Sequence, residues 1–189
     1  MSSGLRLMEI FHEPTAATHS PSVLRQAFSR FPTGVVAICG MDARSVPVGM
    51  VANSFTSVSL DPVLISTNFA RSSKTWPVLR HFDNLGISVL AHNQRSACVN
   101  LASSRSQDRF AGVKWQKSPA GSAVFIDGAV MWMQACLMSE FEAGDHTVAI
   151  MRLQSIQVFS DRHPLVFYRS QYHTLGPREP GSNVRRLPA

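Results

Sequence analysis

Charged residues are scarce in this chain of 189 residues: they make up 16% of the sequence, against about 25% in an average soluble domain. Acidic residues are the rarer sign, with 12 Asp and Glu against 18 Lys and Arg, which gives a net charge of +6. No pair of carboxylates suggests glycosidase chemistry. The basic residues are scattered from Arg6 to Arg186 without a basic stripe and interleaved aromatics, which argues against nucleic-acid binding.

Two readings of this composition stay open. The low charged fraction is consistent with a surface partly buried in an oligomer. The diffuse positive charge suits small anionic ligands such as phosphates or dinucleotides, although a generic basic surface is the plainer reading.

Cysteine is also rare. Cys39, Cys98 and Cys136 share no CxxC spacing and lie in apolar runs, so we expect buried free thiols in a reducing cytoplasm rather than disulfides or a zinc site. The seven histidines form no ligand-spaced set, so we expect no metal. No apolar run reaches the roughly 18 residues of a membrane-spanning helix, so we expect no membrane insertion.

Common nucleotide and catalytic motifs are absent as well. There is no GxGxxG, no Walker loop and no alternating βαβα pattern, which disfavours a doubly wound nucleotide fold. No Ser-His-Asp or Cys-His arrangement can be recognised from spacing.

The elements that are present point to one domain over residues 21–175, between an N-terminal arm over 1–20 and a C-terminal tail over 176–189 that we expect to be flexible. Ser20-Pro21 predicts a helix start, followed by an apolar face of Leu24, Ala27, Phe28 and Phe31. Short helices are predicted over 72–82 and 93–102, and an irregular loop over 103–121. Strands are predicted over 34–39, 48–53, 54–60, 63–68, 84–91, 129–143 and 146–160, with a hairpin over 164–175. This pattern predicts a mainly β protein with short helices, in the form of a β-barrel.

The stretch "GMVANSFTSVSLDPVLIS" (49–66) is crowded with uncharged hydrogen-bonding side chains. In one continuous strand, Asn53, Ser57 and Ser59 project to one face and Ser54 and Thr56 to the other. Such groups at a barrel rim can hold a polar heterocycle or a phosphate. The alternative is a strand whose hydroxyls bind its own backbone or water.

Two further clusters carry candidate chemistry. One combines cations with uncharged hydrogen-bonding groups ahead of a predicted helix, which suits a phosphate; an ordinary capped helix is the alternative. Its members are Asn68, Arg71, Ser72, Ser73, Lys74 and Thr75. The other is the turn Gly144-Asp145 followed by His146, where the histidine either binds a ligand or holds the turn.

Four segments occur in the order "FSRFPTGVVAI", "PVGMVANSFTSVSLDP", "ARSSKTWPVL" and "AGDHTVAIMRL". Together they resemble the short-chain flavin reductase family, the reductase components of two-component flavin-dependent monooxygenases, over roughly residues 22–175. The resemblance implies an FMN-binding split β-barrel that forms a homodimer. It also implies reduction of FMN or FAD by NADH or NADPH, and delivery of the reduced flavin by diffusion to a separate monooxygenase.

The resemblance also implies roles for individual residues. His146 would lie beside the nicotinamide and is the candidate catalytic residue. The flavin-binding set comprises Thr33, Val51, Ala52, Asn53, Ser54, Ser57, Asn68, Phe69, Ala70, Ser72, Ser73, Lys74, Thr75 and Asn100. The nicotinamide-binding set comprises Pro47, Gly49, Met50, His146, Tyr168 and Arg169. Two other functions stay open: a non-catalytic flavin-binding module, and an oxidoreductase like pyridoxamine-phosphate oxidase.

Overall fold

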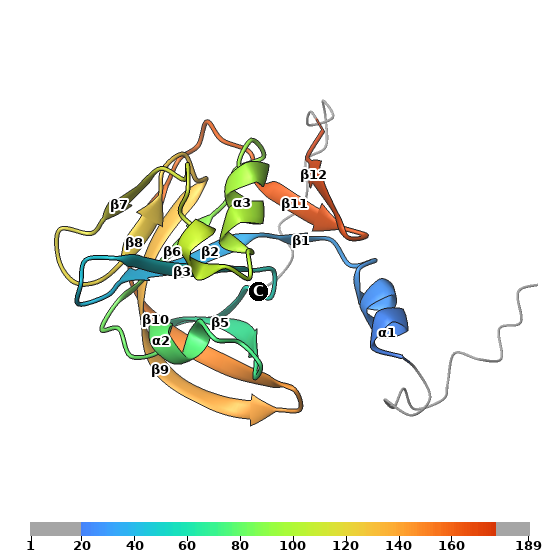
Figure 1. Ribbon diagram of the computed structural model, residues 1–189, viewed down its shortest axis with the longest axis horizontal. Coiled ribbons are helices and arrows are strands. Elements are labelled where there is room, and N and C mark those ends of the chain that lie inside the picture. Colours follow the sequence, from blue (N-terminus) through green and yellow to red (C-terminus); the bar gives the residue numbers. More distant parts are fainter. Residues whose placement is uncertain (1–19, 177–189) are drawn as a thin grey trace, which may run out of the picture.

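The computed structural model describes residues 20–176, which form mostly β-structure with short helices (Figure 1). The predicted arm over 1–20 and tail over 176–189 lie outside the described residues, apart from residues 20 and 176. The helices are α1 (Pro21–Phe28), α2 (Trp76–Leu79), α3 (Arg95–Leu101) and the 3₁₀ helix η2 (Ser106–Asp108). The strands are β1 (Thr33–Gly34), β2 (Val36–Met41), β3 (Pro47–Ala52), β4 (Thr56–Leu60), β5 (Val63–Ala70), β6 (Leu85–Val89), β7 (Trp115–Lys117), β8 (Val124–Ile126), β9 (Met131–Ala143), β10 (His146–Val158), β11 (Leu165–Tyr168) and β12 (Gln171–Thr174).

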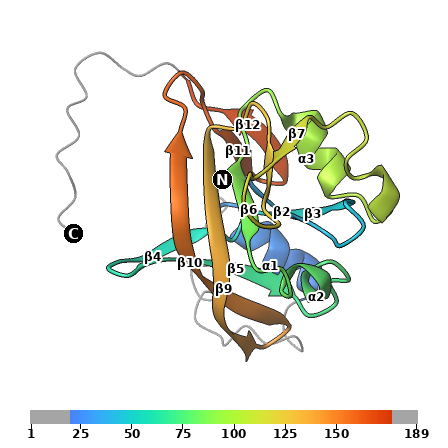
Figure 2. The ribbon, with the colours of Figure 1, turned by 90° about the vertical axis from the view of Figure 1, so that its left-hand side faces the viewer.

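The main sheet has seven antiparallel strands in the order β3-β2-β6-β9-β10-β5-β4. Its longest members, β9 and β10, run side by side (Figure 2) and pair along 13 residues each, with two register shifts that let them bend. The end strands β3 and β4 follow each other in the chain, so residues 53–55 join the two edges of the sheet where no strand ladder does. The prediction of a mainly β split barrel with short helices is confirmed.

Strand β2 lies between two hydrophobic cores because it is buried on both faces. Val36 and Ile38 point into the barrel, where they meet side chains of β5, β9 and β10. Cys39 points to the other side, as does Ala37, and this second core includes Leu101 of α3. The alternation of side chains along a strand therefore divides one apolar run between both cores.

Helix α1 stands apart from the barrel (Figure 1). It begins as predicted, with Ser20 accepting a hydrogen bond from the backbone N–H of Val23 and proline in the first turn. None of its residues is buried, and the side chains of Phe28 and Phe31 are 73% and 75% exposed. The predicted apolar face is present, but within residues 20–176 nothing covers it.

Three sequence predictions are wrong in detail. Residues 115–117 of the expected loop form β7, which pairs with β8, a strand the sequence analysis missed. The stretch from 53 to 59 is not one continuous strand: β3 ends at Ala52, and β4 has a register shift between Ser57 and Ser59, so simple alternation fails. Of the cysteines, which are free, Cys136 is only half-buried, because it points to the face of β9 opposite Ala135 and Leu137, which pack in the barrel core. None of the described helices is long and apolar enough to cross a membrane.

Candidate functional site

The connection between β3 and β4 is fixed by one hydroxyl. Oγ of Ser54 accepts a hydrogen bond from the backbone N–H of Asn68 at 2.9 Å and donates one to the carbonyl of the same residue at 3.0 Å. The Ser54 side chain therefore fastens the connection after the edge strand β3 to β5, which is the backbone-satisfying alternative considered for this stretch. Asn53 and Ser57, on either side of it, are exposed and free to meet a ligand.

A cavity of about 200 Å³ opens beside this connection, and we call it the Asn53 cavity. It brings together three predicted flavin-binding residues with others from α3 and the β11–β12 hairpin. Its lining residues are Val35, Val51, Ala52, Asn53, Cys98, Phe167 and Tyr172. The sequence analysis missed Cys98, Phe167 and Tyr172 as site residues, since they lie far from the motif along the chain.

The wall opposite the motif is uncharged at neutral pH. The thiol of Cys98 donates a hydrogen bond to the hydroxyl of Tyr172 at 3.3 Å. Burial raises the pKa of the Cys98 thiol, and burial followed by the contact with Cys98 raises the pKa of Tyr172 to about 12. Both groups therefore stay protonated, and the cavity presents hydrogen-bonding groups without ionised side chains.

The predicted phosphate cluster is largely engaged in holding its own turn. Oγ of Ser73 accepts hydrogen bonds from the backbone N–H groups of Thr75 and Trp76 at 3.3 and 3.2 Å. The ring of Phe69 is 1% exposed and stacks on Trp76 at 3.9 Å between ring centres, so it belongs to the barrel core. Lys74 remains exposed, as does Ser72.

Arg109 is a residue that the sequence analysis missed, and it joins three parts of the site. Its guanidinium donates to the carbonyl of Gly49 in β3 at 2.8 Å, to the carbonyl of Ser103 at 2.8 Å, and to Oγ1 of Thr75 at 2.5 Å. Arg109 therefore links the predicted nicotinamide strand to the predicted phosphate cluster. It comes from the polar loop over 103–121, where no pattern of spacing distinguishes it.

His146 lies at the corner where β10 begins, paired with Ala70 of β5. Its Nδ1 is 2.7 Å from Oδ1 of Asp145, and the hydrogen bond from His146 lowers the pKa of the Asp145 carboxyl. A cavity of about 600 Å³, here the His146 cavity, opens beside this pair. It is lined by Arg25, Ala70, Arg71, Ser72, Gly144, Asp145 and His146.

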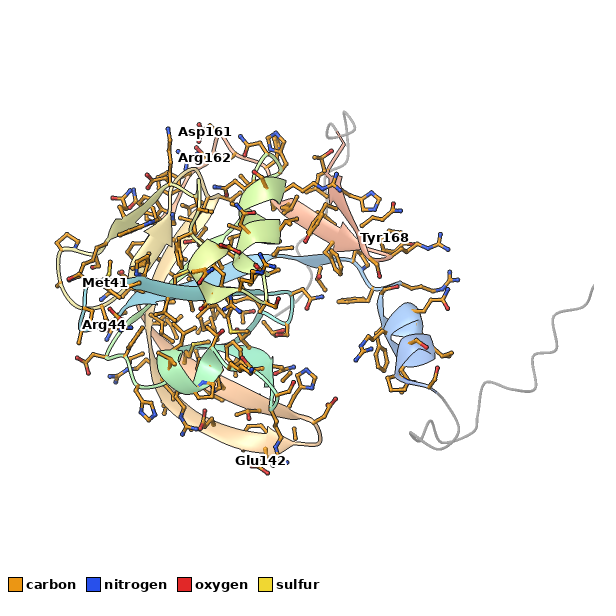
Figure 3. The ribbon with its side chains drawn as sticks, in the orientation of Figure 1. Met41, Arg44, Glu142, Asp161, Arg162 and Tyr168 are labelled. Atoms are coloured by element: carbon orange, nitrogen blue, oxygen red, sulfur yellow. The ribbon has the colours of Figure 1, made fainter. Side chains whose placement is uncertain are left out.

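The remaining predicted residues are dispersed. Oγ1 of Thr33, in β1, is buried without a hydrogen-bond partner among the described residues. The ring of Tyr168 lies at the end of β11 (Figure 3), edge-on to His173. The side-chain amide of Asn100 donates to the carbonyl of Ala111 at 2.8 Å, and Asn100 lines neither cavity.

The residues of β3 that were predicted to bind the nicotinamide also lie in different environments. Gly49 is buried, and a Cβ added there would lie 2.5 Å from Sγ of Cys39, so no larger residue fits. Met50 packs against the barrel core, while Pro47 begins the strand.

The Asn53 cavity does not include His146, and the His146 cavity does not include Asn53. Within residues 20–176, no cluster of three or more His, Cys, Asp or Glu side chains is arranged to hold a metal ion.

Similar known proteins identify the family of this chain. Residues 28–176 match the family described as the flavin reductase like domain. The chain is 38% identical over 152 residues to a flavin reductase of Pseudomonas putida, covering 80% of this chain and 88% of that protein. It is 35% identical over 157 residues to HsaB, the reductase subunit of a flavin-dependent monooxygenase of Rhodococcus jostii (strain RHA1), covering 83% and 79%.

A solved structure of the NADH:FAD oxidoreductase SgcE6 of Streptomyces globisporus C-1027, in complex with NAD and FAD fragments, is similar with a TM-score of 0.79. The identity is 28%, and the match covers 88% of this chain and 98% of that one. The family match spans the β3–β4 connection, the whole lining of the Asn53 cavity and the lining of the His146 cavity except Arg25. The chain therefore belongs to the flavin reductase like family.

Proposed function

We propose that this flavin reductase binds its flavin at the Asn53 cavity, takes hydride from NADH, and supplies reduced flavin to a separate monooxygenase. Flavin reduction follows from the family, since one relative is named a flavin reductase and another a monooxygenase reductase subunit. The observation that carries the location is that the family match and the uncharged Asn53 cavity coincide at Val51, Ala52 and Asn53.

The residues at this cavity fit a flavin. The walls combine apolar surface from Val51 and Phe167 with the neutral amide of Asn53. Nearby in the fold, β1 pairs with β11, and Oγ1 of Thr33 in β1 is buried without a partner, so a ligand atom would satisfy it. At about 200 Å³ the cavity is smaller than the roughly 300–1,000 Å³ of typical ligand sites, so a bound flavin would extend beyond it.

A bound flavin itself accepts the hydride, so the protein has to supply orientation and electrostatics rather than bond-making side chains. Strand β3 ends the sheet order and pairs with β2 alone, so its outer backbone groups have no partner strand. Backbone N–H groups of residues 51–57 can therefore donate hydrogen bonds to the ring and stabilise negative charge that develops on reduction. Neutral walls help here, because a fixed negative charge would oppose reduction.

The contact with Asp145 supports the proposal that His146 meets the nicotinamide through one defined nitrogen. The ionised carboxylate of Asp145 only accepts hydrogen bonds, so Nδ1 of His146 carries the proton that lies between them. In neutral imidazole this leaves Nε2 as an acceptor that can bind a ligand. Asp145 thus fixes the tautomer of the candidate catalytic residue.

A direct assay tests this proposal: the purified protein is mixed with NADH and with FMN or FAD, and the loss of NADH absorbance is followed. We expect rapid turnover, with NADH preferred over NADPH; the SgcE6 structure, with NAD and FAD fragments, supports this choice of reductant. A protein that binds flavin without oxidising either reductant would instead be a flavin-binding module. A protein that binds no flavin would favour a different cofactor, as in pyridoxamine-phosphate oxidase.

The role of His146 is tested by His146→Gln, with Asp145→Asn as the matched change to its neighbour. We expect His146→Gln to raise the KM for NADH or to slow hydride transfer, while flavin affinity stays unchanged. Asp145→Asn should produce a smaller effect in the same direction, because it frees the tautomer but keeps the ring. If His146→Gln changed neither NADH affinity nor hydride transfer, the placement beside the nicotinamide would be wrong.

The proposal includes a homodimer, and α1 supports it. This helix buries none of its residues in its own subunit and exposes Phe28 and Phe31, while the Asn53 cavity is too small for a flavin on its own. In a homodimer, a second copy of this chain would cover the exposed side chains of Phe28 and Phe31 and complete the wall of the Asn53 cavity. Phe28→Asp combined with Phe31→Asp should therefore move the protein from dimer to monomer in sedimentation velocity, since each buried Phe contributes about 1.5–3 kcal/mol. Val99→Asp, a control on exposed α3, should leave the dimer intact; a wild-type monomer would contradict the proposal.

The partner is a flavin-dependent monooxygenase reached by diffusion of reduced flavin. The cytoplasm is the proposed location, since the three free cysteines persist in a reducing compartment. Physical separation tests the route: reductase and monooxygenase are placed on opposite sides of a dialysis membrane, reduced flavin is allowed to cross without oxygen, and oxygen is then admitted to the monooxygenase side. Diffusing reduced flavin should then support turnover of the monooxygenase. Activity that requires mixing of the two proteins would instead indicate a complex.

A further inference from the structure

A third cavity, of about 410 Å³, lies between α1 and the β11–β12 turn, and we call it the Arg169 cavity. Figure 1 shows these two elements on the same side of the molecule. Its polar lining consists chiefly of guanidinium and hydroxyl groups, and no acidic side chain lines it. They belong to Ser22, Arg25, Ser29, Arg30, Arg169 and Ser170.

None of the three arginines of this cavity forms an ion pair within residues 20–176; Arg25 has a more distant acidic neighbour in Asp145, with which it lines the His146 cavity. The ion pairs found over residues 20–176 use other arginines, at positions 44, 71, 80 and 162. Three guanidiniums around one hollow repel one another unless an anion lies between them. A guanidinium binds phosphate oxygens through paired N–H donors, and the serine hydroxyls can complete the set. The chemistry of the cavity therefore points to a phosphate group.

The turn that carries Arg169 has an energetically unfavourable backbone conformation. Arg169 and Ser170 have φ values of 50° and 60°, in a two-residue turn between the paired residues Tyr168 and Gln171. Asn-Gly is the usual sequence for such a turn, because positive φ is unfavourable for other residues. The backbone N–H of Arg169 donates to the carbonyl of Ser29 at 2.7 Å, which holds the turn against the end of α1. Strain of this kind concentrates where a side chain is needed for function.

Arg25 connects this cavity to the proposed reaction site. It lines the Arg169 cavity and also the His146 cavity, so the two hollows are neighbours that share one guanidinium. The acidic group that lines the His146 cavity is Asp145, whose carboxylate is engaged with His146 and also feels the charge of Arg25, while the guanidinium of Arg71 pairs with Glu142. A ligand with its ring beside His146 would therefore direct an anionic group past Arg25.

We propose that the Arg169 cavity binds the pyrophosphate of the nicotinamide dinucleotide, with Arg25, Arg30 and Arg169 as its ligands. This inference rests on the proposed function for its choice of ligand. A flavin phosphate has the same chemistry and is the competing source. The nicotinamide dinucleotide is favoured because Arg25 links this cavity to His146 rather than to the Asn53 cavity.

Binding without turnover tests the site first. ADP-ribose, which carries the pyrophosphate but no nicotinamide, is titrated by calorimetry into wild type and into Arg25→Gln, Arg30→Gln and Arg169→Gln. Each variant should weaken binding about tenfold or more, as expected for loss of a hydrogen-bonded charge. Arg44→Gln is the control with the same charge change: Arg44 lies on the side of the molecule opposite Tyr168 (Figure 3) and pairs with Asp42. If Arg44→Gln weakened ADP-ribose binding as much as the three variants do, the effect would come from the overall positive charge of the protein. That result would overturn the proposed phosphate site.

Kinetics then separate the two phosphate sources. The three variants should raise the KM for NADH at nearly unchanged kcat, and leave the dissociation constants of FMN and FAD unchanged. Weaker flavin binding with an unchanged KM for NADH would assign the cavity to the flavin and overturn the proposal. If wild type bound ADP-ribose through these arginines but did not oxidise NADH, the proposed function would fail while the phosphate site stood.

A further variant separates ligand binding from a structural role of the turn. Arg169→Gly removes the guanidinium and relieves the positive-φ strain at the same position. We expect it to raise the melting temperature and to weaken ADP-ribose binding, two effects of opposite sign. A purely structural arginine would give lower thermal stability on replacement, and that result would contradict the proposal.

Discussion

Arg109 offers the sharpest test of how the site is held together. It comes from an irregular loop, yet its guanidinium bonds to the carbonyls of Gly49 and Ser103 and to the hydroxyl of Thr75. Gly49 is buried in β3, and Thr75 is 8% exposed at the start of α2. Replacing Arg109 by Ala therefore leaves two enclosed acceptors without a donor, while the Ser103 carbonyl can turn to water.

The expected loss follows from these partners. An enclosed polar group that loses its partner costs about 1–3 kcal/mol, and the half-buried position of Arg109 favours the lower part of that range. For the two enclosed acceptors we expect Arg109→Ala to lower the free energy of unfolding by about 2–4 kcal/mol. For a domain of this size the melting temperature should fall by roughly 5–15 °C.

Urea denaturation followed by circular dichroism measures the free energy of unfolding, and fluorescence titration measures FMN affinity. Flavin affinity should fall too, because Thr75 belongs to the predicted phosphate cluster. Arg105→Ala is the control, an exposed arginine of the same loop. Arg109→Lys should recover less than half of the loss, since one ammonium cannot span three acceptors. An Arg109→Ala protein with the urea midpoint of wild type would refute the idea that this side chain ties β3 to α2.

Two further predictions concern the barrel itself. Gly86→Ala should lower the free energy of unfolding by about 3 kcal/mol or more, because its Cβ would lie 2.1 Å from the carbonyl oxygen of Val124; Gly34→Ala, with nothing within 4 Å, should change it by less than about 0.5 kcal/mol. Equal urea midpoints for the two variants would contradict this. Burial raises the pKa of Cys39 to about 12, so a thiol reagent should label half-buried Cys136 in the native protein and spare Cys39. Because the unfolded chain ionises this thiol near its ordinary value of 9.0 while the folded chain keeps it protonated, stability should fall as pH rises between 9.0 and about 12, and Cys39→Ser should flatten that fall. Prompt labelling of native Cys39 would show that this thiol is not enclosed.

Much of the fold could be predicted from local signals. The start of α1 follows from Ser20-Pro21, and the long hairpin of β9 and β10 follows from two apolar runs around Gly144-Asp145. Each of these signals involves only a few neighbouring residues, so it can be recognised in the sequence without knowledge of the tertiary structure. Strands β7 and β8 were missed because each has only three residues, which is too short for a period to appear.

The lining of the Asn53 cavity could be predicted from the sequence only where its residues are consecutive. Val51, Ala52 and Asn53 lie in one motif and do line one cavity. The opposite wall comes from Tyr172, on a hairpin more than a hundred residues later, and sequence patterns do not specify such long-range contacts. The direction of a side chain was equally hidden: Ser54 and Asn53 are adjacent, but only the first is turned inward to bind backbone.

The distribution of charge suits an enzyme that must give its flavin away. Around Asn53 the cavity wall is neutral, since Cys98 and Tyr172 both keep their protons, so a reduced and more anionic flavin gains no strong ionic contact there. Three guanidiniums without an ion pair stand elsewhere, between α1 and the turn at Arg169, where a dinucleotide would bring two phosphate charges. A further guanidinium, that of Arg95, lies over the ring of Tyr172 but does not line the Asn53 cavity. If the two proposed sites are correct, strong ionic contacts bind the hydride donor, while weaker neutral contacts hold the flavin and permit its release as reduced flavin.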